Sequence, residues 1–308
     1  MKKILIVFDE PGWCFHSHAL QIQKRLPEYY IDIIDHRKNV NSASDHFDIC
    51  YLMDPFPLYH GHPFAYKTIM GLRNEFLYKE HPHGAEGLYN GGFPGRCVSI
   101  KDKCSMFHVV NKNQIEVFKG VVTDRPLLLA QHGIDEELFS KEKYTKKNEE
   151  VLTVGVSGRD SKNKVFGAIL NACSKTGIKF VSAQYGRNKI SKDKMPDFYN
   201  TIDVYVSLSL TEGLANPPME CGAMSIPVIS TRCGAIEEMI IDGESGLLID
   251  RTEDALIGAL ERMKDNEFRR KLGEKFNEEI VKNWIWKVRI EDFRNMFELF
   301  FELKEKKC

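Results

Sequence analysis

The sequence DVYVSLSLTEGLANPPMECGAMSIPVIS, residues 203–230, decides the fold. Its first part is an apolar run that predicts a strand ending near Ser209. Asn216 and Pro217 are residues that favour a helix start, so we expect Asn216 as the N-cap and Pro217 at the first helical position. A second apolar run at 226–230 predicts another strand. A strand, a helix and a strand in this order predict a parallel sheet covered by helices.

Two acidic residues flank the predicted helix start. Glu212 lies in the loop after the strand, and Glu220 lies about one turn into the helix. Backbone N–H groups at a helix N-terminus attract anions, and a carboxylate accepts hydrogen bonds from neighbouring hydroxyls. The spacing therefore predicts a ligand with a phosphate and a diol. The alternative is a solvated loop acid and a helix acid that the dipole favours.

The alternation of strands and helices recurs in both halves of the chain, although the segment 73–96 has no such period. Residues 3–8 form a continuous apolar run, typical of a strand buried on both faces. The charged segment 140–150 has the composition of a linker, and a second alternating set begins at Val151. The 308 residues are enough for two domains of about 150 residues each. We therefore expect an α/β protein with two domains.

Composition argues against several classes of function. The net charge of −1 is not the basic charge of a nucleic-acid-binding protein, and the lysine clusters at 141–147, 162–164 and 187–194 are interpreted as solvated loops. No apolar run approaches the about 20 residues of a membrane span, and the N-terminal run is too short for a signal peptide. None of the eight cysteines forms a C-x-x-C pair. We expect reduced thiols and a cytoplasmic protein.

The Glu212-x7-Glu220 spacing resembles the retaining GT-B glycosyltransferases of the family 4 class. The resemblance extends to the neighbouring residues Gly213, Pro217, Pro218, Gly222 and Ile226-Pro227-Val228-Ile229. It implies that Glu212 contacts the donor sugar and Glu220 the ribose of the nucleotide. It also implies that backbone amides between the two acids approach the sugar and its phosphates, namely those of Gly213, Leu214, Ala215 and Asn216.

Other segments also match this family. Arg159 and Lys164, after the predicted strand 151–156, are similar to the family's Arg/Lys pair. The resemblance implies that both cations stabilise the departing diphosphate. Val165 stands where the family usually has glycine. The segments 131–135, with Phe139, 234–238 and 242–248 resemble further ordered elements of the family, and Trp286 begins a helix like its C-terminal tail.

The N-terminal half resembles the family less closely. Gly12 follows the first strand, and the resemblance implies that its backbone approaches the donor phosphates. The family's histidine after the fourth strand is replaced by Arg73 or Asn74. Four histidines are left open as substitutes: His60, His62, His81 and His83. The pairs His16/His18 and His60/His62 lack the additional ligand spacing of a known metal site.

The resemblance implies a GT-B fold, with two Rossmann-like domains facing a central cleft. Its parts are an acceptor-binding domain over 1–135, a nucleotide-sugar-binding domain over 150–285 and a C-terminal helix over 286–308 that crosses back to the N-terminal domain. The aromatic stripe at 293–301 is expected to be core or interdomain packing.

The implied reaction moves a sugar from a nucleotide-sugar donor, a UDP- or GDP-sugar, to an acceptor hydroxyl with retention of configuration. Its catalytic residues are Arg159, Lys164 and Glu212. The acceptor is expected to be a saccharide or glycoconjugate. No metal or cofactor is expected, because cationic side chains and helix N-termini replace a divalent ion in this fold class. The alternatives are transfer to a modified nucleic-acid base, as in phage-type DNA glycosylation, a non-catalytic sugar-nucleotide-binding protein, and a GT-B epimerase or phosphorylase.

Overall fold

A computed structural model of the protein divides the chain into two compact units. Unit 1 comprises Met1–Gly133 and Trp286–Cys308, and unit 2 comprises Ile134–Ile285. The structure describes residues 1–38, 40, 45–53, 67–72, 104–119, 124–145, 151–161, 164–184 and 190–306.

Unit 1 contains a six-stranded parallel sheet in the order β2-β1-β3-β4-β5-β6. Its strands are β1 (Lys3–Phe8), β2 (Tyr30–Asp35), β3 (Ile49–Leu52), β4 (Thr68–Leu72), β5 (Met106–Val109) and β6 (Leu127–Leu129). Its helices within the described residues are α1 (Cys14–Arg25), α5 (Lys112–Lys119) and α12 (Trp286–Glu305). Strands β1 and β2 are paired in such a register that Phe8 at the end of β1 lies beside Asp35 at the end of β2. These elements lie where the apolar runs predict them.

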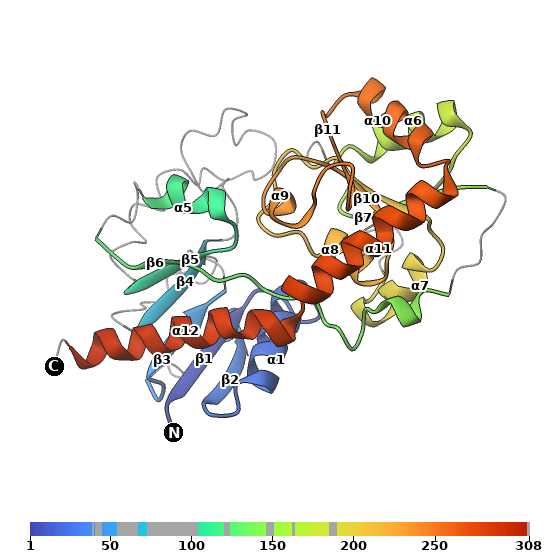
Figure 1. Ribbon diagram of the computed structural model, residues 1–308. Helices are drawn as coiled ribbons and strands as arrows, with labels where there is room; N and C mark the ends of the chain where they lie inside the picture. The colour runs from blue at the N-terminus through green and yellow to red at the C-terminus, as the bar shows by residue number, and fades with distance from the viewer. Residues whose placement is uncertain are drawn as a thin grey trace. The chain divides into compact units, whose positions relative to one another are not determined.

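Both faces of the unit 1 sheet are covered, as the continuous apolar run of β1 predicts. Ile4 and Ile6 belong to the core shared with α1 and α12. Leu5 and Val7 point to the opposite face, where the core includes Phe118 of α5. This alternation follows from the period of two along a strand. Helix α12 lies beside α1 across the first face (Figure 1).

The aromatic stripe of α12 is part of the unit 1 core, as expected from its helical spacing. Phe293 and Phe297 are fully buried, and both rings contact the ring of Tyr51, with centroids 6.3 and 5.9 Å away. Large aromatic side chains contribute much of a core's buried apolar area. The C-terminal helix is therefore an integral part of unit 1.

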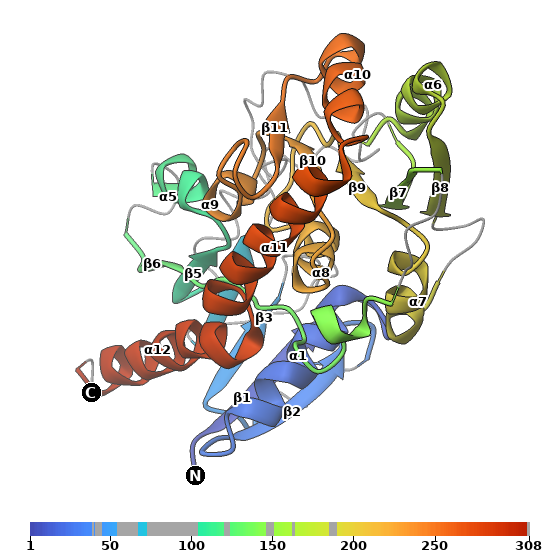
Figure 2. The same cartoon turned by 45° about the vertical axis from the view of Figure 1, so that its right-hand side comes forward.

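Unit 2 contains a five-stranded parallel sheet in the order β11-β10-β9-β7-β8 (Figure 2). Its strands are β7 (Thr153–Gly158), β8 (Lys179–Gln184), β9 (Val204–Ser207), β10 (Val228–Thr231) and β11 (Leu247–Ile249). Its helices are α6 (Phe166–Thr176), α7 (Met195–Tyr199), α8 (Asn216–Ala223), α9 (Ile236–Met239), α10 (Glu253–Arg262) and α11 (Asn266–Asn283), with short 3-10 turns η4 (Lys141–Lys143) and η5 (Lys192–Lys194).

Two details of unit 2 correct the sequence analysis. Helix α8 begins at Asn216 with Ala215 as its N-cap, so Asn216 is the first helical residue and not the cap. Pro217 fits one position further in, because N–H groups in a first turn have no intrahelical partner to lose. The described part of the expected linker belongs to unit 2, since Tyr144 Oη donates to the carbonyl oxygen of Ile202 at 2.9 Å.

Helices α8 and α11 lie side by side, and small residues permit their close approach (Figures 1 and 2). A Cβ on Gly222 of α8 would lie 2.7 Å from the Phe276 ring. A Cβ on Gly273 of α11 would lie 2.0 Å from the carbonyl oxygen of Ser225. The backbone therefore leaves no room for a methyl group at Gly273.

We expect Gly273→Ala to lower the free energy of unfolding by about 1–3 kcal/mol, because α11 must move away from the Ser225 backbone in the turn after α8. Gly258→Ala is the matched control, since Gly258 also lies inside a helix and nothing lies within 4 Å of its added Cβ. That substitution should stabilise the protein by about 0.5–1 kcal/mol. Urea unfolding of both variants measures the difference, and equal stabilities would contradict the close packing.

Candidate active site

Glu212 and Lys164, two residues predicted to act together, are in direct contact in unit 2. Lys164 Nζ lies 2.6 Å from Glu212 Oε1, and each side chain is 22% exposed. Ser209 Oγ donates a hydrogen bond to the same carboxylate oxygen at 2.8 Å. The carboxylate is thus held by one cation and one hydroxyl at the carboxyl end of the sheet, where ligands bind in parallel α/β folds.

The turn after β7 places Lys164 beside the sheet. Gly158 ends the strand with φ +112°, and a Cβ there would lie 3.5 Å from Lys164 Cε. Val165 has φ +46° and ψ 50°, a left-handed conformation that glycine adopts without strain. This backbone would suit the glycine that the family resemblance leads one to expect at this position. Arg159 follows Gly158, and its side chain is exposed.

Glu220 lies deeper than the sequence suggests. Only 5% of the residue is exposed, and Tyr199 Oη of α7 donates to Glu220 Oε2 at 2.5 Å. Burial raises the pKa of the Glu220 carboxyl above its usual value, while the charge of Lys192 and the Tyr199 hydrogen bond oppose this rise. One carboxylate oxygen is thus fixed by tyrosine, which orients the whole group.

Tyr199→Phe is expected to lower the free energy of unfolding by about 1.5–3 kcal/mol at pH 8, because a buried carboxylate loses its hydrogen-bond donor. It should also raise the pKa of Glu220 further, since the lost bond favours the charged form. The cost should shrink below the ordinary carboxyl pKa of 4.5, where Glu220 is protonated in both folded and unfolded chains. Urea unfolding at several pH values measures it, with the exposed Tyr30→Phe as control. A pH-independent cost would contradict the pairing.

The loop that carries Glu212 is held by the turn between β10 and α9. Ala235 N donates to the carbonyl oxygen of Gly213 at 3.0 Å. Gly234 has φ +58°, and a Cβ there would lie 2.5 Å from the carbonyl oxygen of Glu212. The Glu212 loop therefore packs directly on the backbone of Gly234. Any side chain at position 234 would displace this loop.

Several residues have a role in this site that the sequence analysis did not assign to them. Ser209, Tyr199, Lys192 and Gly234 each contact or act on one of the two acids or the loop between them. Lys192 belongs to a lysine cluster interpreted as a solvated loop, yet it is partly buried and its charge reaches Glu220. The position of Ser209 at the end of a strand is a sequence signal that could have found it.

The amides expected to meet the donor lie where the loop becomes helix α8. Gly213 and Leu214 are buried, and Ala215 and Asn216 are partly buried. The prolines at 217 and 218 have no N–H, so the amide donors at this helix start lie before them. Their contact with donor phosphates stays a prediction.

Gly12 lies in unit 1, in the turn after β1. It has φ +82°, and its N–H donates to His16 Nδ1 at 3.0 Å. A donor phosphate would have to compete with His16 for this N–H. The predicted contact of Gly12 with the donor therefore stays a prediction, and His16 is a neighbour that the sequence did not indicate.

The histidine pair on α1 does not form a shared site. His18 is buried with its ring stacked on His132 at 4.0 Å, whereas His16 stacks on Phe8 at 4.5 Å. No group of three or more potential metal ligands gathers within the described ranges. The open candidates for the N-terminal histidine lie outside the described residues: His60, His62, Arg73, Asn74, His81 and His83.

Among the helices that the structure describes, none has the length and apolar character to cross a membrane.

Sequence comparison identifies the region that contains this site. The family profile of glycosyl transferases group 1 matches residues 141–266. An uncharacterised glycosyltransferase of Methanocaldococcus jannaschii is 27% identical over 210 residues, which cover 66% of this chain and 58% of that protein. The chain thus spans little more than half the length of this relative.

Structural comparison covers nearly the whole chain. Sucrose-phosphate synthase from Thermosynechococcus elongatus superposes with a TM-score of 0.78 at 14% identity, covering 98% of this chain and 100% of that one. Anabaena HepE, in complex with UDP and glucose, superposes with a TM-score of 0.72 at 12% identity, covering 97% of this chain and 100% of that one. The shared architecture of two parallel-sheet α/β domains is the GT-B fold. The chain therefore contains a glycosyl transferases group 1 domain, within which Lys164, Glu212 and Glu220 lie, and it has the GT-B fold.

Proposed function

We propose that the protein is a retaining glycosyltransferase of the family 4 class that takes its sugar from a nucleotide-sugar donor. The observation that carries this proposal is the contact of Lys164 with Glu212 at the carboxyl end of the unit 2 sheet, together with a buried Glu220 in α8 that Tyr199 orients. A cation for a diphosphate and two carboxylates for hydroxyl groups are the recognition groups that such a donor needs.

Each residue has a distinct task in the proposed reaction. Lys164 and Arg159 stabilise the negative charge that develops on the leaving diphosphate. Glu212 accepts hydrogen bonds from the donor sugar, and Glu220 accepts them from the ribose. The amides from Gly213 to Asn216 meet the sugar and its phosphates, and no metal ion is required by this assignment.

The bond changes follow from retention of configuration. The bond between the sugar C1 and the diphosphate oxygen breaks, and the acceptor oxygen forms its bond to C1 on the same face. The acceptor proton passes to the departing diphosphate. We propose a UDP- or GDP-sugar as donor and a saccharide or glycoconjugate as acceptor; the HepE complex with UDP and glucose supports a UDP-sugar.

A thermal-shift panel of UDP-, GDP- and ADP-sugars tests donor binding, because a ligand at 100 times its Kd stabilises a protein by about 2.7 kcal/mol. We expect one nucleotide class to raise Tm. With an acceptor saccharide, nucleoside diphosphate should be released, and NMR of the product should show the donor's anomeric configuration. The inverted anomer would contradict retention alone. No shift and no release would contradict the enzyme assignment.

A further inference from the structure

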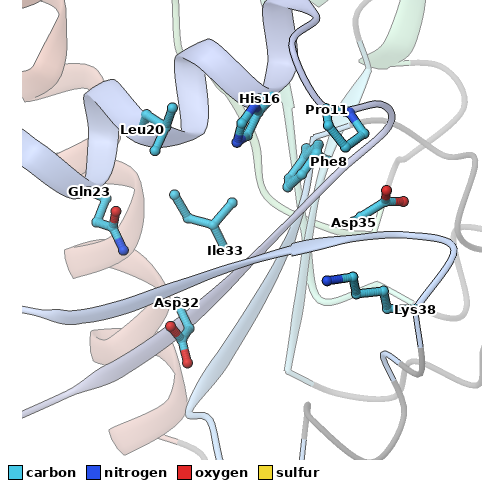
Figure 3. Close-up of a pocket in the computed structure, with 9 residues that line it drawn as sticks. All are labelled: Phe8, Pro11, His16, Leu20, Gln23, Asp32, Ile33, Asp35 and Lys38. Atoms are coloured by element: carbon cyan, nitrogen blue, oxygen red, sulfur yellow. The ribbon is translucent and has the colours of Figure 1, made fainter.

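A hollow of about 330 Å³ lies between α1 and β2 of unit 1, but its charged and apolar side chains point to different sides of β2 (Figure 3). Ile33 lies beside Ile6 on the side of the sheet that α1 covers. Asp32 points to the other side, because successive side chains of a strand alternate, and Lys38 also lies across β2 from Ile33. Asp32 and Lys38 are therefore not placed to contact a ligand that rests on Ile33.

Two buried hydroxyl groups form a pair at the carboxyl end of the unit 2 sheet. Ser157, the last residue but one of β7, is 4% exposed, and Tyr205 of β9 is 2% exposed. Their hydroxyl oxygens are 3.0 Å apart, and the Ser157 N–H donates to the tyrosine oxygen at 3.3 Å. Burial raises the pKa of Tyr205, so its hydroxyl keeps its proton. Two hydrogen bonds thus fix this pair.

The pair has one hydroxyl hydrogen more than it can use internally. One hydrogen makes the bond between the two oxygens. The other hydroxyl hydrogen has no acceptor among the residues that the structure describes. An unpaired buried donor costs about 1–3 kcal/mol, so a ligand that brings an acceptor gains from binding here.

The register of the strands indicates which hydroxyl supplies the remaining hydrogen. Tyr205 lies beside Gly155, two residues before Ser157 in β7, so the tyrosine side chain extends toward the carboxyl end. Ser157 lies nearer to that end, with only Gly158 after it in the strand. Ligands of parallel α/β folds bind at the carboxyl ends of the strands. This order favours Tyr205 as the donor to Ser157 Oγ, with the Ser157 hydrogen directed toward the ligand.

Tyr205 also connects the hydroxyl pair to Glu220. The Tyr205 ring lies edge-on to the ring of Tyr199, with centroids 6.3 Å apart. Tyr199 Oη donates to Glu220 Oε2 at 2.5 Å, and Glu220 Oε1 accepts no hydrogen bond from the described residues. A hydroxyl donor on Ser157 and a carboxylate acceptor on Glu220 therefore belong to one buried cluster.

We propose that Ser157 donates a hydrogen bond to the ribose of the nucleotide, at the hydroxyl group that also donates to Glu220. This inference rests on the proposed function, in which Glu220 binds the ribose. A hydroxyl has one hydrogen and two lone pairs, so one ribose oxygen can serve both residues. Tyr205, Ser157, the ribose and Glu220 then form a chain of hydrogen bonds in which each bond polarises the next.

Calorimetric titration of UDP, GDP and ADP into the full chain, each with its 2′-deoxy and 3′-deoxy analogues, tests this inference. We expect Ser157→Ala to weaken the nucleoside diphosphate that binds by about threefold to tenfold. The loss should vanish with the analogue that lacks the contacted hydroxyl, because this analogue brings no acceptor for Ser157. Thr153→Val is the matched control, since it removes a buried hydroxyl at the amino end of the same strand and should leave the Kd unchanged.

The outcomes separate this inference from the proposed function. An unchanged Kd in Ser157→Ala, or an equal loss with both deoxy analogues, would overturn the ribose contact and leave the proposed function standing. Failure of all three nucleotides to bind the wild type would overturn both. Ser157→Cys, which has nearly the same shape but a weak donor, should show the same pattern and replaces the alanine variant if that variant does not fold.

Discussion

Glu212→Gln should lower kcat/KM for the nucleotide-sugar donor by about 10² to 10³, the usual loss when one group aimed at the reacting centre is removed. The carboxylate is held by Lys164 at 2.6 Å and by Ser209 at 2.8 Å, so its position is fixed before a donor arrives. Glutamine has the same shape but lacks the charge that accepts strong hydrogen bonds from sugar hydroxyls.

The same variant should not weaken binding of the free nucleoside diphosphate. Lys164 loses its ion-pair partner in Glu212→Gln, which leaves its charge for the diphosphate. We therefore expect the Kd of UDP, or of whichever nucleotide binds, to stay equal or to fall while turnover collapses. Calorimetry and a coupled assay measure the two effects. Glu244→Gln, at an exposed glutamate of the same unit, is the control. A parallel loss of diphosphate affinity would contradict the proposed division of tasks.

Gly234→Ala should reduce kcat/KM at least tenfold although residue 234 touches no ligand in the proposed reaction. Its new Cβ would lie 2.5 Å from the carbonyl oxygen of Glu212 and 2.6 Å from that of Gly213, so the loop must move. A displacement of 1 Å at a catalytic group costs about 10² in rate. Gly234 is thus a positioning residue for Glu212.

Gly243→Ala separates this displacement from backbone strain. Gly243 has φ +78°, and its added Cβ would have nothing within 4 Å. Both variants should lose about 1–2 kcal/mol of stability because alanine is strained at positive φ, and Gly234→Ala should lose more because its Cβ also meets the backbone of the Glu212 loop. Only Gly234→Ala should lose activity when the two are assayed well below their Tm. Equal activities would contradict the role of Gly234.

Most of the fold could be predicted because parallel strands in this chain are buried on both faces. The run at 3–8 became β1, and the alternation of apolar segments gave two parallel sheets. The boundaries of single elements were harder to predict. Asn216 is a frequent N-cap, but two prolines after it let the helix start at Asn216 itself. The preference of asparagine for the N-cap position did not decide where α8 begins, because the first turn of a helix accepts proline.

The candidate site could be predicted in part. Lys164 and Glu212 are 48 positions apart in the chain and meet as an ion pair, so the structure brings together two residues that the sequence analysis assigned to one site. The partner of Glu220 could not be inferred, because Tyr199 lies in a short helix whose packing depends on the whole unit. The close approach of Gly234 to the Glu212 loop is likewise a tertiary contact that leaves no periodic signal in the sequence.

The central claim is that Lys164, Glu212 and Glu220 form the binding site of a nucleotide sugar. The most direct measurement is calorimetric titration of UDP-glucose, GDP-mannose and ADP-glucose into the wild type and the Glu212→Gln/Glu220→Gln double variant. We predict that one donor binds the wild type with one site per chain, and that its Kd rises more than about 100-fold in the double variant, since two charged hydrogen-bonding groups are lost. Equal affinity for that donor in both proteins would contradict the claim.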